Sequence, residues 1–432
     1  MKKINYPLFN AELTRTKLDN GMVVNLLPRH MFHKTYAILT VDYGSVDDTF
    51  RDERGKMRTV PAGIAHFLEH KMFEKKDHDA FDLFSRYGAD ANAFTSYTRT
   101  SYLFSTTRHL RECMNVLLNF VQDPYFSQKS VDKEKGIIAE EIKMYDDDPY
   151  WRLYQVTMGN LYPKSQLSLD IAGSTESIQQ IKPEDLYLCY NNFYSTANMN
   201  LFVTGNFDAE QMLMTIKENQ DRKQVNDAPV PTRIFKPTRY PVIKSAEEKM
   251  NVSEPKVMIG IRGDKPLPQS REGLKRRIAI NLLLELLLSE TSDNFQRLYD
   301  SGLADDSFDY EIQIERGFYF LLISGNTKDP EKFVSEIKRI LLQAQDQVAN
   351  QKNELELAAR ELLGRTIKSI NSLEAIANRY EGKLFDNATI FDIPDLLKDI
   401  KMEDLITAAK ELINFDNATV TQILPEEKED QE

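Results

Sequence analysis

Two of the chain's six histidines lie four residues apart in the segment AHFLEHKMFE, with a glutamate directly before the second. Six histidines in 432 residues predict roughly 0.08 pairs at this separation by chance, and roughly 0.01 with a glutamate in this place, so the arrangement needs an explanation. In an α-helix, positions i, i+3 and i+4 share one face, so His66, Glu69 and His70 would project together. Two neutral imidazoles at this spacing can bind one zinc ion. The pattern is the H-x-x-E-H form of the metalloprotease helix, in which Glu69 would activate a zinc-bound water as the general base.

A catalytic zinc site uses three protein ligands, and no histidine follows position 109, so the third ligand is expected to be a carboxylate. The segment VDKEKGIIAEEIKMYDDDP is predicted to form a helix that starts near Ser130. Within it, Glu134 and Glu141 are two turns apart and share a face. We favour Glu141 as the ligand and Glu134 as a carboxylate that supports the catalytic site. Glu140 is the alternative ligand, because spacing alone does not decide between neighbours.

A purely structural explanation of the same segment is also available. Helical histidines are often solvated, and the apolar residues around them would then form only a core-facing stripe: Phe67, Leu68, Met72 and Phe73. That explanation predicts no bound metal. The other histidines are predicted to lie on the surface: His30, His33, His78 and His109.

Length and composition limit the class of protein. A chain of 432 residues is too long for one ordinary core, so two domains or more are expected. The net charge of −12 argues against a nucleic-acid partner, which would require basic patches. Two cysteines without a CxxC pair indicate a reducing compartment. Neither a signal-like apolar run nor a stretch of roughly 18 apolar residues is found, so a cytoplasmic protein without a membrane partner is expected.

The order of predicted elements is the same in the two halves. The first half reads as a strand at residues 36–43, the AHFLEH helix, strands within residues 93–106 and a helix at residues 110–121. The second reads as a strand at VMIGIRG, the helix IAINLLLELLLSE, the strands DSFDYEIQ and GFYFLLIS, and a helix at residues 330–344. An internal duplication explains this order. The predicted fold class is α+β, with two homologous α/β-roll domains that each pack a mainly antiparallel sheet with helices.

A proline-rich region separates the halves. Residues 219–255 contain five prolines, a density that breaks helices and favours extended connections: Pro229, Pro231, Pro237, Pro241 and Pro255. We therefore predict a zinc-bearing domain at residues 1–218, a linker region at 219–255 and a second domain at 256–432. The helix of the second domain carries leucines and Glu285 where the first carries the histidine motif, so any chemistry belongs to the first half.

These motifs together resemble the pitrilysin and insulin-degrading-enzyme family of zinc peptidases, and in particular its short bacterial two-domain members. The resemblance lies in GIAHFLEHKMFE, YGADANAFTSYTRTSYLF and EKGIIAEEIKMYDDDP, with further matches at IAGSTESI and FYSTANMNLFVTGNFD. In that family the ligand glutamate follows another glutamate by seven positions, which selects Glu141 over Glu140. The resemblance thus implies the following roles: zinc ligands His66, His70 and Glu141, general base Glu69, and supporting carboxylate Glu134.

The resemblance also implies how substrate is held. The family's NA-x-T segment, here Asn92, Ala93 and Thr95, lies on a strand edge that pairs with an extended peptide by β-augmentation. Two such chains close like a clamshell around the peptide, so a dimer is expected. The expected function is a zinc-dependent endopeptidase that hydrolyses peptides inside this chamber. The alternative is a non-catalytic peptide-binding or assembly subunit of the same fold.

One feature departs from the family pattern. Active members carry an arginine and a tyrosine seven positions apart, which orient the substrate and stabilise the oxyanion. Here Arg297 has Ala304 seven positions later, and Tyr299 stands too close to take that place. A heterodimer with a zinc-less homologue that supplies the pair would fit this pattern. Nitrogen and oxygen ligands alone do not distinguish zinc from manganese.

Overall fold

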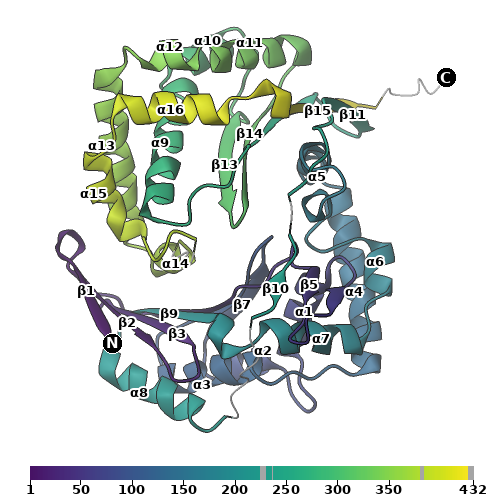
Figure 1. The fold of residues 1–432 in the computed structure, drawn as a ribbon, viewed down its shortest axis with the longest axis vertical. Helices are drawn as coiled ribbons and strands as arrows, with labels where there is room; N and C mark the ends of the chain where they lie inside the picture. The colour runs from purple at the N-terminus through teal and green to yellow at the C-terminus, as the bar shows by residue number, and fades with distance from the viewer. Residues whose placement is uncertain (224–229, 236, 380–383, 427–432) are drawn as a thin grey trace. The chain divides into compact units, whose positions relative to one another are not determined.

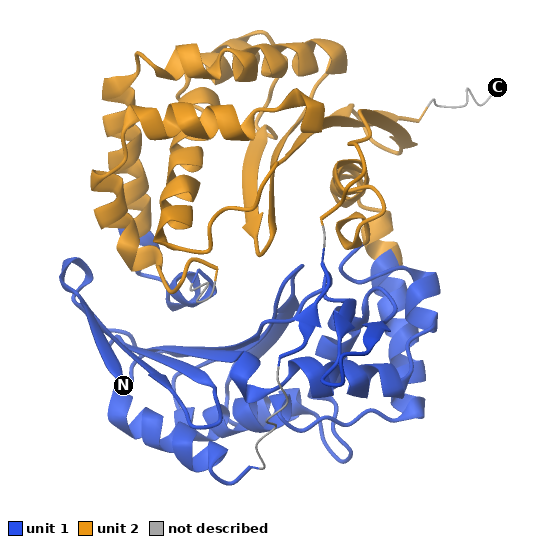
Figure 2. Ribbon diagram, viewed as in Figure 1, with its two compact units in different colours: residues 1–142, 170–235, 367–381 blue, residues 143–169, 236–366, 382–432 orange. Residues whose placement is uncertain are grey.

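The structure is a computed structural model that describes residues 1–223, 230–235, 237–379 and 384–426 (Figure 1). The chain forms two compact units, each assembled from separate stretches of sequence (Figure 2). Unit 1 contains Met1–Ile142, Asp170–Phe235 and Ile367–Glu381, and unit 2 contains Lys143–Leu169, Lys236–Thr366 and Gly382–Glu432. Each unit has its own hydrophobic core.

The strands of unit 1 are β1 (Lys2–Tyr6), β2 (Ala11–Lys17), β3 (Val23–Pro28), β4 (Thr35–Val41), β5 (Thr49–Arg51), β6 (Met57–Thr59), β7 (Asp90–Thr95), β8 (Thr100–Thr106), β9 (Met199–Gly205) and β10 (Thr232–Arg233). Those of unit 2 are β11 (Ser245–Met250), β12 (Lys256–Arg262), β13 (Asp309–Glu315), β14 (Phe318–Asn326) and β15 (Ala418–Pro425).

The helices of the first half of the chain are α1 (Ile64–Phe73), α2 (Ala80–Arg86), α3 (Leu110–Val121), α4 (Gln128–Asp146), α5 (Pro149–Leu161), α6 (Thr175–Gln179), α7 (Pro183–Phe193) and α8 (Ala209–Gln220). Those of the second half are α9 (Arg271–Leu288), α10 (Asp293–Asp300), α11 (Pro330–Leu342), α12 (Ala344–Val348), α13 (Lys352–Ser369), α14 (Leu373–Asn378), α15 (Ile393–Lys398) and α16 (Met402–Leu412). Short 3-10 turns occur at Pro7–Phe9, Gln166–Ser168, Thr196–Asn198, Ile390–Asp392 and Phe415–Asn417.

The two large sheets repeat one topology. In unit 1 the strand order is β1-β2-β3-β9-β4-β8-β7, and in unit 2 it is β11-β15-β12-β14-β13. The pairs β3–β9 and β11–β15 are parallel, and every other neighbouring pair in these sheets is antiparallel. The last five strands of unit 1 therefore match those of unit 2 in order and direction. The predicted α+β fold with mainly antiparallel sheets is confirmed, and the repeated order is what an internal duplication predicts.

Central strands are apolar on both faces because helices cover both sides of the sheet. In β4 the residues of one face, including Leu39, belong to the core, while Tyr36 on the other face hydrogen-bonds Asn378 of α14. In unit 2 the helix α5 packs on β12 and β15, where a Cβ at Gly260 would lie 2.8 Å from Thr157. Each sheet is thus covered by a helix that comes from the other half of the sequence.

This exchange of α5 and α14 explains why the compact units are discontinuous. The predicted ranges 1–218 and 256–432 are continuous, and they do not coincide with the units, because side-chain packing recruits helices across the halves. Within the predicted linker, residues 224–229 and 236 lie outside the described residues. Its described parts add strands to both units: β10 pairs with β5, and β11 pairs with β15.

The strand β10 is fixed to unit 1 by a buried ion-pair cluster. Arg233 lies 3.3 Å from both Asp42 Oδ2 and Asp47 Oδ1, and the Asp47 side chain is fully buried. Breaking a buried pair by removing one partner leaves an uncompensated charge.

We therefore expect Arg233→Met to lower the free energy of unfolding by about 3 kcal/mol. Urea denaturation followed by circular dichroism measures this difference. Arg222, an exposed arginine nearby in the chain, supplies the control, and Arg222→Met should leave the unfolding midpoint unchanged. Equal midpoints for both variants would show that the buried cluster contributes no net stability.

Candidate metal centre

The helix α1 begins at a position that only glycine fits. Its N-cap, Gly63, has φ of +86°, and a Cβ there would lie 2.2 Å from the carbonyl oxygen of Ala172. From this start, the face of α1 carrying Phe67, Leu68 and Met72 enters the core. The predicted apolar stripe is therefore real, and it positions the histidine face beside it.

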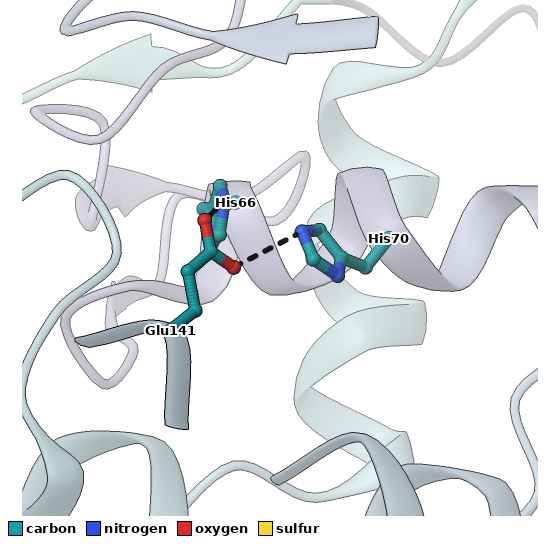
Figure 3. Close-up of side chains that lie close together, drawn as sticks. All are labelled: His66, His70 and Glu141. Carbon is teal, nitrogen blue, oxygen red and sulfur yellow. Dashed lines mark ion pairs between the residues drawn. The ribbon is translucent and has the colours of Figure 1, made fainter. Parts of the chain in front are cut away.

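Three side chains from α1 and α4 converge (Figure 3). His66 Nε2 is 3.7 Å from Glu141 Oε1, and His70 Nε2 is 3.7 Å from Glu141 Oε2. One ligand atom from each of the three residues lies within 4.8 Å of the others. Three atoms bound tetrahedrally to one zinc ion at about 2.1 Å would be about 3.4 Å apart. The donor set and its spacing therefore fit a zinc ion.

The histidines differ in their electrostatic environments. Burial, together with the neighbouring His70, lowers the pKa of His66 to about 3. Burial also opposes protonation of His70, but its hydrogen bond to Glu134 and the charge of Glu69 raise its pKa. A neutral imidazole is the form that binds a metal, so His66 is already in the ligand state near neutral pH.

Glu134 holds His70 from the side opposite Glu141. His70 Nδ1 is 3.1 Å from Glu134 Oε1. Burial of Glu134 favours its neutral form, but the hydrogen bond from His70 and the charges of His70 and Lys71 together outweigh burial and lower the pKa of this carboxyl. When Nδ1 carries the proton, Nε2 is left free to face the centre, which is how outer carboxylates fix a ligand histidine.

Glu69 lies beside the three candidate ligands without being one of them. Its side chain is buried, and the Oγ1 hydroxyl of Thr95 donates a 2.5 Å hydrogen bond to Glu69 Oε2. Burial raises the pKa of Glu69, and this effect outweighs the hydrogen bond from Thr95. A carboxylate with a raised pKa is a better proton acceptor near neutral pH.

The structure places Asn92 and Ala93 on β7, at the edge of the unit 1 sheet. The amide N–H of Ala93 donates to Asn92 Oδ1. Thr95, the last residue of the same strand, contacts Glu69 instead, a contact that the sequence did not indicate.

Of the two neighbouring glutamates on α4, the structure brings Glu141 to the histidines and leaves Glu140 exposed. Consecutive residues of an α-helix are rotated by about 100° about its axis, so only one of the two can face α1. The surface positions predicted for the other histidines are confirmed: His30, His33, His78 and His109 are all exposed.

A residue that sequence reasoning missed is Lys71, which follows His70 directly. Its side chain is fully buried beside Glu134. The sequence contains a sign of this burial, because in EHKMF the lysine directly precedes the apolar Met72 and Phe73 at the end of the helix.

Unit 2 has an ion pair at the equivalent place. By order along the chain, α9 and α13 correspond to α1 and α4, and Arg365 of α13 lies 2.7 Å from Glu285 of α9. In the same unit Arg297 bonds Asn294, Tyr299 is half-exposed, and Ala304 is buried in the core. Ala304 therefore offers no hydroxyl for an oxyanion.

No helix in the part of the chain that the structure describes is long and apolar enough to cross a membrane.

Comparisons with known proteins agree with the geometry. Residues 29–175 match the sequence model of the insulinase family (peptidase family M16), and residues 180–362 match that of the peptidase M16 inactive domain. The chain is 41% identical to the uncharacterized zinc protease YmfH of Bacillus subtilis strain 168, covering 98% of this chain and 99% of that protein. It is 26% identical to the putative zinc protease AlbF of the same strain, over 77% of each chain.

Solved structures show the same fold. A putative M16-like peptidase from Alicyclobacillus acidocaldarius superposes with a TM-score of 0.93 at 32% identity, covering 98% of this chain and all of that one. A protease from Helicobacter pylori superposes with a TM-score of 0.83 at 19% identity, covering 96% of this chain and 100% of that one.

Proposed function

Since the chain belongs to peptidase family M16, we propose that it is a zinc-dependent endopeptidase that hydrolyses extended peptides at the centre formed by His66, His70 and Glu141. The observation that carries this proposal is the convergence of these three ligands with a buried carboxylate, Glu69, beside them. The relatives named as zinc proteases support the activity and the metal.

His66, His70 and Glu141 would hold the zinc ion, with Glu134 orienting His70. A bound zinc ion polarises the scissile carbonyl and lowers the pKa of a water molecule toward about 7. Three protein ligands are the number typical of catalytic zinc sites, so His66, His70 and Glu141 would suffice to hold the ion for this chemistry. The second half of the chain, which matches the M16 inactive domain and carries leucines on α9, would serve as scaffold.

Glu69 would carry the proton. Its carboxylate takes a proton from the attacking water as the new C–O bond forms at the scissile carbon. It then delivers this proton to the amine nitrogen as the C–N bond breaks, so that the carboxylate is regenerated. The hydrogen bond from Thr95 holds Oε2 and leaves Oε1 for the water.

The edge of β7 would hold the peptide. An extended peptide that pairs with this strand gains main-chain hydrogen bonds with little demand on its sequence. The Ala93 amide, which Asn92 now satisfies, would be released to the peptide when the Asn92 side chain rotates.

The assembly and compartment stay predictions from sequence. We propose a dimer that encloses the peptide like a clamshell, and a heterodimer with a zinc-less homologue is the form that would supply the missing arginine–tyrosine pair. The two cysteines, both free and buried in the structure, support the proposal of a reducing, cytoplasmic compartment.

The purified chain is expected to contain about one zinc per molecule and to lose peptide hydrolysis when a chelator removes the metal. Hydrolysis of an unstructured reporter peptide, with metal content measured before and after chelation, tests this. Re-addition of zinc should restore activity. The measurement is made on the chain alone and with a homologous zinc-less partner. Zinc binding with no hydrolysis in either sample would favour the alternative, a non-catalytic peptide-binding subunit.

Thr95→Val is expected to lower kcat roughly 10- to 100-fold, because a hydrogen bond to a charged group contributes roughly 1.5–3 kcal/mol and 1.36 kcal/mol is tenfold in rate. Steady-state kinetics on the reporter peptide measure the change, and Thr95→Ser, which keeps the hydroxyl, is the control. If Thr95 instead acts only on the substrate, KM should rise while kcat is unchanged.

A further inference from the structure

Lys71 is a fully buried lysine on the ligand-bearing helix. It directly follows His70 on α1, and none of its side chain is exposed. Burying an ammonium group is strongly unfavourable unless carboxylates compensate for its charge. The surroundings of its Nζ atom therefore indicate what the residue does.

Two carboxylates surround this ammonium group. Lys71 Nζ bonds the carboxylate of Glu74, one turn further along α1, and lies 3.8 Å from Glu134 Oε2 on α4. The other oxygen of Glu134 is the partner of His70 Nδ1. Consecutive residues of α1 thus contact the two oxygens of a single carboxylate on α4.

The Glu134 carboxylate is thus restrained at one oxygen by a hydrogen bond with His70 and at the other by an ammonium group 3.8 Å away. Glu134 also lies two turns before Glu141 on the same helix, so anchoring Glu134 determines where Glu141 meets α1. By restraining Glu134, the Lys71 ammonium group therefore affects two candidate ligands. It fixes the orientation of His70, and it fixes the register of α4 against α1, which determines the position of Glu141.

We propose that Lys71 is a positioning residue for the zinc site: its ammonium group locks Glu134 against His70 and so sets the affinity for the metal. The inference rests on the proposed zinc-dependent function. The competing explanation is that Lys71 only staples the end of α1 through its i, i+3 pair with Glu74.

Zinc affinity, measured by competition with a chelator of known affinity, tests the proposal on the full chain. Lys71→Met is expected to weaken zinc binding roughly 10- to 100-fold, the range that loss of an outer partner of a metal ligand produces. Glu134→Gln should weaken it similarly. The double variant should bind zinc no more weakly than Glu134→Gln alone, because Lys71 acts through Glu134.

Two controls separate this role from a structural one. Glu74→Gln should leave zinc affinity unchanged, whereas the staple explanation predicts the same loss as in Lys71→Met. Lys135→Met removes a lysine that neighbours Glu134 in sequence but pairs with Asp132, and it should also leave affinity unchanged.

Unchanged affinity in Lys71→Met, or additive losses in the double variant, would overturn the proposal. If Lys71→Met does not fold but the double variant does, removal of the Glu134 charge has rescued the loss of Lys71. That rescue would show that Lys71 acts through Glu134. If neither folds, Lys71 stabilises the fold independently of Glu134 and the proposal is wrong. Wild-type protein that binds no zinc would instead contradict the proposed function.

Discussion

Replacing Glu69 with glutamine is expected to lower kcat by roughly 10²- to 10⁴-fold, because removal of a general base costs a rate factor of this size. Glutamine keeps the shape and can still accept the hydrogen bond from Thr95, but it cannot take a proton from water. Since Glu69 lies beside the ligands and is not one of them, zinc content should be unchanged. Steady-state kinetics and metal analysis on the same preparation measure both quantities.

The control for this experiment is Glu140→Gln, which removes an exposed carboxylate from α4. Its kcat should match that of the wild-type chain. A Glu69→Gln variant that retains wild-type activity would remove Glu69 from the mechanism and require another base. Loss of zinc from that variant would mean that Glu69 is itself a ligand.

Replacing His66 with alanine is expected to weaken zinc binding by more than about 100-fold. Loss of a group that only hydrogen-bonds a metal ligand weakens binding by up to about 100-fold, and loss of a ligand itself should cost more. Hydrolysis should fall with the metal content, because two remaining ligands do not make a catalytic site. His66 is the less exposed histidine of the pair, with 14% of its side chain exposed against 26% for His70.

Thermal unfolding gives an independent measurement. Zinc that binds only the folded state stabilises it by RT ln(1 + [Zn]/Kd), so added zinc should raise the melting temperature of the wild-type chain. It should not raise that of His66→Ala. The control is His78→Ala, an exposed histidine, for which the rise should be retained. Equal zinc-dependent rises in His66→Ala and the wild type would contradict the proposed ligand set.

The two units differ at the equivalent pair of helices. Each unit has a pair of helices joined by side-chain contacts, α1 with α4 and α9 with α13. In unit 1 the pair carries the three candidate metal ligands, whereas in unit 2 the Glu285–Arg365 ion pair stands in the equivalent place. An ion pair can link two helices without a metal, and among the described residues the one candidate ligand set lies in unit 1.

Much of the candidate catalytic motif could be predicted from sequence because it is local. His66, Glu69 and His70 fall on one helical face by the 3.6-residue period alone. The repeated order of strands and helices likewise followed from hydrophobic patterns, and the strand orders of the two sheets agree with it. The resemblance to zinc peptidases then selected Glu141 from two neighbouring glutamates, and the geometry agrees with that choice.

Tertiary structure decided the contacts between residues far apart in the chain. Glu134 contacts His70 across 64 positions of sequence, and Thr95 contacts Glu69 across 26. Neither separation corresponds to a helix or strand period, so the sequence pattern does not predict these contacts. The burial of Lys71 depends on α4 packing over α1, so its partners could not be inferred from its own helix. The assignment of α5 to unit 2 and of α14 to unit 1 likewise depends on packing between segments far apart in the chain. Local periodicity determines which face a side chain occupies, but only the packing of helices and sheets determines what that face meets.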